Sequence, residues 1–127
     1  MLKALNVAFC GTTDMEASVA FYRDVLGMSE TMVTPYWSEF RCGDLRIGIH
    51  PSDGLVPLVD LGRGWTVCFE TADLSALRQS VEEHGCAVLA EYHQTPSGVI
   101  LTFADPQGNP LQAIQLGTKI EDFQRNP

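Results

Sequence analysis

An internal repeat is the feature that most constrains the fold of this chain. The segment Asn6–Phe9 (Asn-Val-Ala-Phe) echoes Thr66–Phe69 (Thr-Val-Cys-Phe), and an aspartate able to cap a helix follows each segment, at Asp14 and at Asp73. After each aspartate the sequence pattern predicts one helix and then three strands. Two copies are too few for a solenoid. The repeat therefore predicts an α+β domain of two βαβββ modules, whose half-sheets form a shared cleft.

Local patterns predict where the elements of the modules lie. Thr13 and Glu16 have the spacing of a capping box, and Asp14 is an alternative cap for the first helix. We expect that helix to continue as far as Gly27, because glycine commonly follows the last turn of a helix. The predicted strands are residues 5–10, 29–34, 37–42, 45–50, 65–71, 86–92, 99–104 and 111–116.

The length of the chain, 127 residues, fits a single domain. Within it we expect a first module over about residues 4–50 and a second over about 65–117. Residues 51–64 are rich in glycine and proline, which indicates a linker. Residues 118–127 form a polar tail that we expect to fray.

Charge and composition argue against several classes of partner. Eight Lys and Arg against sixteen Asp and Glu give a net charge of −8, so nucleic acid is not an expected partner, whereas a cationic ligand is compatible. No apolar run is long enough for a membrane span, and residues 4–10 have the pattern of a strand instead of a signal peptide. The four cysteines lack CxxC spacing. They are typical of reduced core thiols in a cytoplasmic protein.

Two motifs carry a resemblance to a known family. Ser18–Gly27 (SVAFYRDVLG) is similar to an S-x-x-F-Y-x-x-x-L-G helix, and Phe103–Asn109 (FADPQGN) is similar to an F-x-D-P-x-G-N turn. Both resemble the vicinal oxygen chelate superfamily, which contains glyoxalases, extradiol dioxygenases, fosfomycin-resistance enzymes and bleomycin-binding proteins. The resemblance covers about residues 4–117 and implies the fold proposed above, together with a homodimer. These motifs specify a fold and not an activity.

The resemblance also implies where a metal would be held. Enzymes of this family hold one divalent metal through His, Glu or Gln on the first and fourth strands of each module. In this sequence those positions are Asn6, Gly48, Thr66 and Gln112. None is histidine or carboxylate, so we expect no metal cofactor. The alternative is one divalent metal bound by His50, Glu70 and Gln112, since His50 shares a strand face with Gly48 and Glu70 shares one with Thr66.

The main functional hypothesis is therefore a metal-free pocket that sequesters or senses a small aromatic or cationic molecule. The residues expected to line it are Asn6, Trp37, His50, Thr66, Cys68, Glu70 and Gln112. Trp37, Tyr36 or Trp65 would stack on a planar ligand, although the alternation of Trp65 also fits packing on a helix.

Two other functions remain open. The first is a lyase, isomerase or dioxygenase with an atypical metal site, in which Glu70 is the candidate catalytic acid or base. The second is a regulatory partner whose cleft is vestigial. The sequence contains no Gly-x-Ser-x-Gly motif and no phosphate-binding glycine motif.

Overall fold

The computed structural model describes residues 1–52, 65–104 and 106–124, so the predicted linker lies outside the described residues except for Pro51 and Ser52. The chain divides into two compact units. The first unit is Val7–Val67, and the second unit combines Met1–Asn6 with Cys68–Pro127. Strand β1 (Leu2–Thr12) contributes residues to both units, as does strand β5 (Thr66–Thr71).

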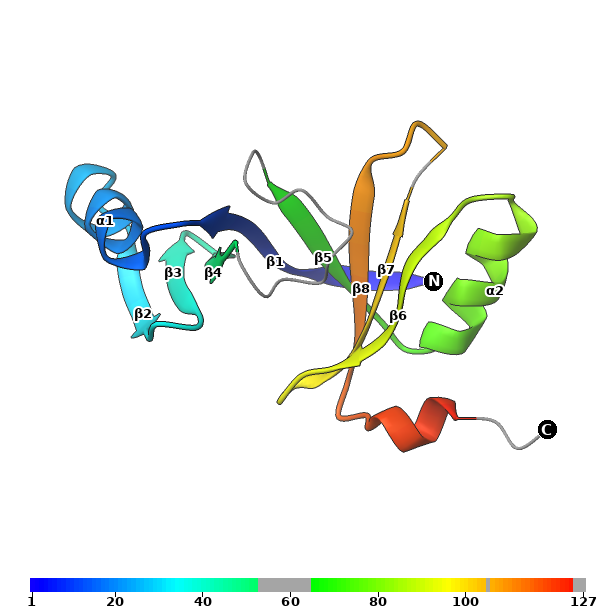
Figure 1. The fold of residues 1–127 in the computed structure, drawn as a ribbon. Coiled ribbons are helices and arrows are strands. Elements are labelled where there is room, and N and C mark those ends of the chain that lie inside the picture. Colours follow the sequence, from blue (N-terminus) through cyan, green and yellow to red (C-terminus); the bar gives the residue numbers. More distant parts are fainter. Residues whose placement is uncertain (53–64, 105, 125–127) are drawn as a thin grey trace. The chain divides into compact units, whose positions relative to one another are not determined.

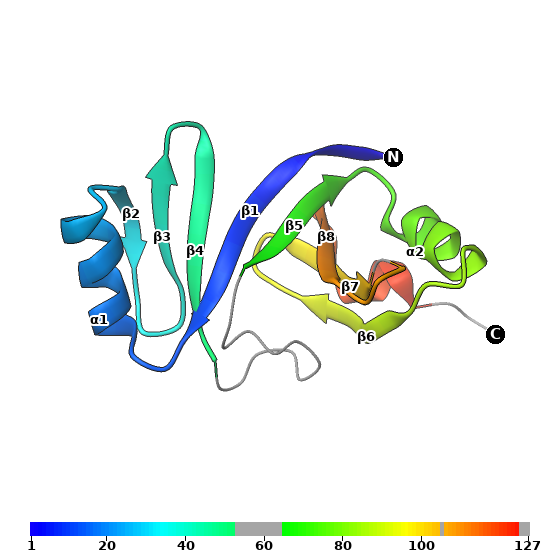
Figure 2. The same cartoon turned by 90° about the horizontal axis from the view of Figure 1, so that it is seen from above.

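The first unit contains a four-stranded mixed sheet with one helical segment on one face (Figures 1 and 2). Besides β1, its elements are α1 (Met15–Ala20), a π-helical turn η1 (Phe21–Val25), β2 (Ser29–Val33), β3 (Ser38–Cys42) and β4 (Leu45–Pro51). The strands follow the order β2-β3-β4-β1. Strand β1 is parallel to β4, whereas β4 with β3 and β3 with β2 are antiparallel.

The second unit repeats this arrangement. After β5 it contains α2 (Leu74–Glu83), β6 (Val88–Gln94), β7 (Gly98–Ala104), β8 (Pro110–Leu116) and a short 3-10 helix η2 (Ile120–Phe123). The strand order β5-β8-β7-β6 again places the first strand parallel to the fourth. The recurrence of the same pairing confirms the predicted α+β fold of two βαβββ modules.

The helix starts follow from their capping residues. The carboxylates of Asp14 and Asp73 each accept a hydrogen bond of 3.0 Å, from the backbone N–H of Ala17 and of Ala76 respectively. The alternative cap, Asp14, is therefore the one used, and not the capping box of Thr13 and Glu16. The first helix also differs from a regular α-helix after Ala20, since the N–H of Leu26 donates to the carbonyl five residues earlier.

Each unit has its own core on the helix side of its sheet. In the first unit the buried side chains are those of Val19, Phe40, Ile47 and Ile49. In the second unit they are those of Leu74, Leu77, Val99, Leu101, Phe103 and Ala113. Apolar residues therefore alternate along β4 and β7 so that every second side chain points toward a helix.

The end of the chain is more ordered than its composition indicates. Ile120 and Phe123 pack against the core of the second unit, and the ring of Phe123 lies 4.8 Å from that of Tyr92. The prediction of a frayed tail is therefore wrong for residues 118–124, because two apolar side chains anchor them. Within the part of the chain that the structure describes, no helix has the length and apolar character needed to cross a bilayer.

Candidate functional site

The face of the first unit opposite α1 is defined by strand register. Phe40, Ile47 and Ile49 point toward α1, so the residues that alternate with them point away from it. The paired positions are Arg41 with Arg46, Glu39 with Gly48, and Phe9 with Gly48. His50 follows Gly48 by two residues and shares this face. We refer to this surface, made by Phe9, Trp37, Glu39, Arg41, Arg46, Gly48 and His50, as the face opposite α1.

The indole of Trp37 covers Gly48. A Cβ atom built at Gly48 would lie 2.0 Å from Cη2 of Trp37, far inside van der Waals contact. The Trp37 ring centroid is 6.1 Å from that of Phe9 and 6.1 Å from that of His50. Trp37 Nε1 donates a hydrogen bond of 3.0 Å to Glu39 Oε1. Position 48 therefore holds glycine because an indole occupies the space of a side chain.

Glu39 is a buried carboxylate that joins Trp37 to an arginine. Arg46 donates to it from Nε at 3.1 Å and from Nη2 at 2.8 Å, and only 7% of Glu39 is exposed. The hydrogen bonds from Arg46 lower the pKa of Glu39 against the opposing effect of desolvation, and the bond from Trp37 adds to the lowering. Sequence reasoning missed Glu39 and Arg46. Counting outward from the Gly43-Asp44 turn would have placed both on this face.

Replacing Glu39 with glutamine should lower the free energy of unfolding by about 1–2 kcal/mol at pH 7, because Arg46 loses a charged acceptor. The hydrogen bonds from Arg46 hold the folded-state pKa of Glu39 below the ordinary value of a glutamate. The carboxylate therefore contributes stability at pH values above that ordinary pKa, and this contribution is lost as the pH falls through the folded-state pKa. Urea unfolding at pH 7 and pH 3 should show the difference between wild type and Glu39→Gln shrinking at pH 3.

The matched control for this prediction is Glu30→Gln, which removes an exposed carboxylate that pairs with Arg23 at 3.2 Å. We expect a loss of no more than about 0.5 kcal/mol from the control. The assigned role of Glu39 would be contradicted if Glu39→Gln lost no more unfolding free energy than the control. It would also be contradicted if the loss were the same at pH 3 as at pH 7.

His50 has a defined ring orientation on the same face. Its Nδ1 lies 2.8 Å from the carbonyl oxygen of Pro51. A neutral ring therefore donates from Nδ1 and carries its lone pair on Nε2. The structure thus brings Trp37 and His50, two of the predicted site residues, side by side in the first unit.

Four of the predicted site residues form two pairs in the second unit. Cys68 and Gln112 are register partners on adjacent parallel strands and are 2% and 7% exposed. Gln112 Nε2 donates to Thr102 Oγ1 at 3.1 Å. Asn6 Nδ2 donates to Glu70 Oε2 at 2.9 Å. The neighbours of Gln112 in the chain, Leu111 and Ala113, pack toward α2, so Gln112 lies on the opposite face of its sheet.

The residues at the expected metal positions do not fit a resident divalent ion. Gly48 has no ligand atom and lies under Trp37, and Thr66 is a neutral hydroxyl that is 2% exposed. Asn6 and Gln112 offer only amide groups, and both donate hydrogen bonds to neighbouring side chains. Imidazole, thiolate and carboxylate groups are the usual protein ligands of zinc and similar divalent ions, whereas neutral amides and hydroxyls bind them weakly. No group of three His, Cys, Asp or Glu residues that could hold a metal occurs within residues 1–52, 65–104 and 106–124.

The alternative metal set is divided between the units. His50 belongs to the first unit, whereas Glu70 and Gln112 belong to the second. Within the second unit, Glu70 accepts from Asn6 and Gln112 donates to Thr102, so both side chains are engaged with other residues. A site that combines the three residues stays a prediction.

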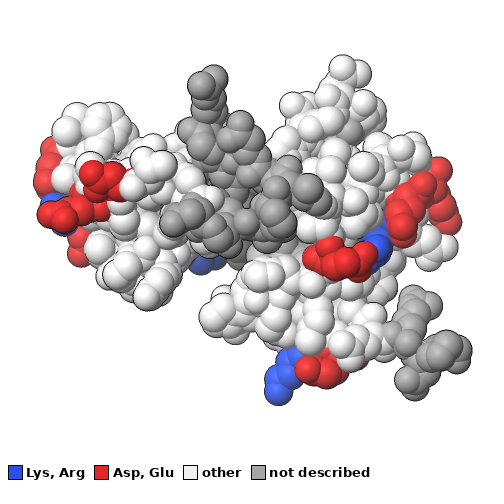
Figure 3. All heavy atoms as spheres, viewed as in Figure 1, with Lys and Arg blue, Asp and Glu red and all other residues white. Residues whose placement is uncertain are grey.

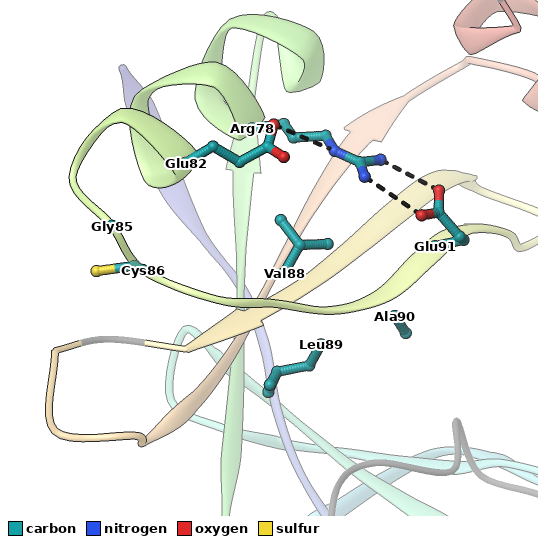
Figure 4. Close-up of a pocket in the computed structure, with 8 residues that line it drawn as sticks. All are labelled: Arg78, Glu82, Gly85, Cys86, Val88, Leu89, Ala90 and Glu91. Carbon is teal, nitrogen blue, oxygen red and sulfur yellow. Dashed lines mark hydrogen bonds and ion pairs between the residues drawn. The ribbon is translucent and has the colours of Figure 1, made fainter.

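Two surface hollows lie elsewhere, beside α2 and β6 of the second unit. Their volumes are about 580 and 720 Å³, and Arg78, Glu82 and Glu91 line both. In the first hollow Arg78 reaches Glu91 from both terminal nitrogens at 3.3 Å, with Glu82 at 3.6 Å from Nε (Figure 4). Arg78 therefore pairs with both glutamates around this hollow, and none of the predicted site residues lines either hollow.

The surface charge follows the composition. On the face shown in Figure 3, acidic side chains cover more of the surface than basic ones. The arginines of the face opposite α1 are therefore exceptions to the general charge of a chain whose net charge is −8.

Solved structures with the same fold carry different activities in their names. The chain matches a methylmalonyl-CoA epimerase variant from Streptomyces coelicolor in complex with 2-nitronate-propionyl-CoA with a TM-score of 0.72 and 17% identity, over 92% of this chain and 99% of that one. It matches a protein described as the NAD-dependent benzaldehyde dehydrogenase of Legionella pneumophila with a TM-score of 0.71 and 16% identity, over 87% and 97%. At these identities the likeness shows the fold alone.

A third structure and a sequence profile name the family. A glyoxalase/bleomycin resistance protein/dioxygenase superfamily member from Vibrio splendidus 12B01 matches with a TM-score of 0.62 and 21% identity, over 88% of this chain and 98% of that one. No curated protein matches the sequence significantly. The profile of the Glyoxalase/Bleomycin resistance protein/Dioxygenase superfamily matches residues 4–113. With the repeated module and the two motifs, this match establishes that the chain belongs to the Glyoxalase/Bleomycin resistance protein/Dioxygenase superfamily.

Proposed function

We propose that this chain binds a small molecule on the face opposite α1, without a divalent metal at the positions used by metal-dependent relatives. The ligand is sequestered or sensed and not converted. One observation carries the proposal: the Trp37 indole lies over Gly48, where a relative would place a metal ligand. A position that holds an aromatic surface in place of a metal ligand favours binding over metal-assisted chemistry.

The neighbouring side chains support an aromatic recognition surface. Trp37 is fixed by its hydrogen bond to Glu39 and by contact with Phe9 and His50. A ring held in one orientation loses little conformational entropy when a planar ligand stacks on it.

The test uses the two tryptophans as separate reporters. In a Trp65→Phe variant, Trp37 is the one remaining tryptophan of the chain. We expect a saturable change in its fluorescence on titration with at least one member of a panel of one- and two-ring aromatic acids, amides and amines, in buffer containing EDTA. The matched control is Trp37→Phe, in which Trp65 reports and no saturable change is expected.

The outcomes separate the alternatives. A saturable response of Trp37 that persists in EDTA supports metal-free binding. A flat response to every compound, or equal responses from the two variants, would contradict the proposal. A response that appears only after a divalent metal replaces the EDTA would favour the enzyme interpretation instead.

A further inference from the structure

Two arginines face each other on the face opposite α1. Arg41 on β3 and Arg46 on β4 are register partners, so their side chains leave the sheet on the same side. Like charges directly opposite one another destabilise a pair of strands. A chain with twice as many acidic as basic residues has little need of such a pair for solubility. We therefore expect a negative charge close to these two arginines.

Glu39 supplies one negative charge against these two positive charges, and both arginines act on its carboxylate. It accepts hydrogen bonds from Arg46 at 2.8 and 3.1 Å and a third from Trp37, so its oxygens are already engaged. Arg41 is exposed, and it forms no ion pair or side-chain hydrogen bond with another residue in the described part of the chain. The local charge of Arg41, Arg46 and Glu39 together is +1. An anion at this place would be attracted despite the overall charge of the chain.

The Trp37 ring lies next to this charge. The ring covers Gly48, which is the register partner of Glu39. The register pair of Arg41 and Arg46 lies two residues further along the same two strands. At the rise of a β-strand that is a separation of about 7 Å. Glu39 fixes both the Arg46 guanidinium and the Trp37 indole, so one carboxylate sets the spacing between the charge and the ring.

We infer that the face opposite α1 binds an anionic planar molecule, whose carboxylate or phosphate pairs with Arg41 beside Arg46 while its ring stacks on Trp37. This inference rests on the proposed binding function and names the class of ligand. It differs from the cationic ligand that is compatible with the net charge of −8, because the local charge of Arg41, Arg46 and Glu39 is positive. Arg41 is the residue that contacts the anion, and Glu39 is a positioning residue.

Three probes of the same shape and different charge test the inference. They are 3-phenylpropionate, its neutral amide 3-phenylpropanamide, and the cation 3-phenylpropylamine. Each is titrated into the full-length Trp65→Phe protein while the Trp37 indole N–H is followed by NMR. We expect the acid to shift this signal saturably, with an affinity at least about tenfold higher than that of the amide or the amine. We also expect the affinity for the acid to fall as salt is added.

The Arg41→Gln substitution should lower the affinity for 3-phenylpropionate by about tenfold and leave the affinity for the amide unchanged. The matched control is Arg23→Gln, because Arg23 pairs with Asp24 and Glu30 away from this face. Equal binding of the acid and the amide, or an acid affinity unchanged in Arg41→Gln, would overturn the inference while leaving the binding function in place. If none of the three probes shifts the signal, the inference also fails, and the fluorescence panel then decides the binding function separately.

Discussion

A methyl group at position 48 should destabilise the protein by about 1–3 kcal/mol, the usual cost of adding a carbon to a filled space. In Gly48→Ala the new Cβ would lie 2.0 Å from Cη2 of Trp37 and 2.3 Å from Cζ2. The indole cannot move away freely, since its nitrogen is bonded to Glu39 and its ring contacts Phe9. Urea unfolding of the variant and the wild type at pH 7 measures the loss.

A double-mutant cycle identifies the cause of that loss. In a Trp37→Ala background the space above residue 48 is vacated, so adding Gly48→Ala should cost no more than about 0.5 kcal/mol. The coupling between the two positions should therefore be close to the full cost of Gly48→Ala alone. The same loss in both backgrounds would show that Trp37 does not lie over Gly48.

Removing the ring of Phe40 should have a larger effect on stability, about 3–5 kcal/mol. Phe40 is 0% exposed and lies between α1 and the sheet, with its ring 6.2 Å from that of Tyr22. The cavity left by Phe40→Ala is enclosed on both sides, so the surrounding side chains can fill it only in part. Thermal and urea unfolding of the variant should show a marked drop in the midpoint.

Phe21→Ala is the matched control, because the Phe21 side chain is 47% exposed and packs edge-on against Tyr22. We expect this control to cost about 1 kcal/mol or less. Equal losses in the two variants would mean that Phe40 is not part of the core on the α1 side. That result would also undermine the assignment of Glu39 and Arg41 to the opposite face, since the alternation of β3 relates the two.

The order of the elements was predictable from sequence because its determinants are local. Asp14 and Asp73 cap helices through residues three positions away, and the Gly43-Asp44 turn closes a hairpin of adjacent strands. The repeat then required both halves to pair their strands in the same way. The π-helical turn after Ala20 was not predicted, because apolar spacing fits an α-helix and a π-helix equally well.

The contacts of the site were less predictable, because they depend on partners across strands. Sequence reasoning named Gly48 as a lost ligand position but gave no reason for the glycine, which becomes evident once Trp37 is placed above it. Glu39 and Arg46 were missed for the same reason: they are seven residues apart and meet only through the hairpin register. Trp65 proved to lie edge-on to Tyr22 of the first unit, 5.9 Å away.

The fold alone does not select a reaction for this chain. Solved structures of similar fold are named as an epimerase and as a dehydrogenase, at 17% and 16% identity to this sequence. Function in such a family depends on the side chains that each member places on its sheets. In this chain those side chains include an indole, a buried glutamate paired with a partly exposed arginine, and neutral amides.

Metal retention is the measurement that shows whether this chain holds a divalent metal. Purified protein is incubated separately with Ni, Zn, Mn and Fe(II), desalted, and analysed for metal bound per chain. We expect none of the four ions to be retained, in the wild type and in Gln112→Ala alike, because the residues at the family positions are poor ligands for divalent metals. Near-stoichiometric retention of one ion, lost in Gln112→Ala, would contradict the account and place a lyase, isomerase or dioxygenase activity first.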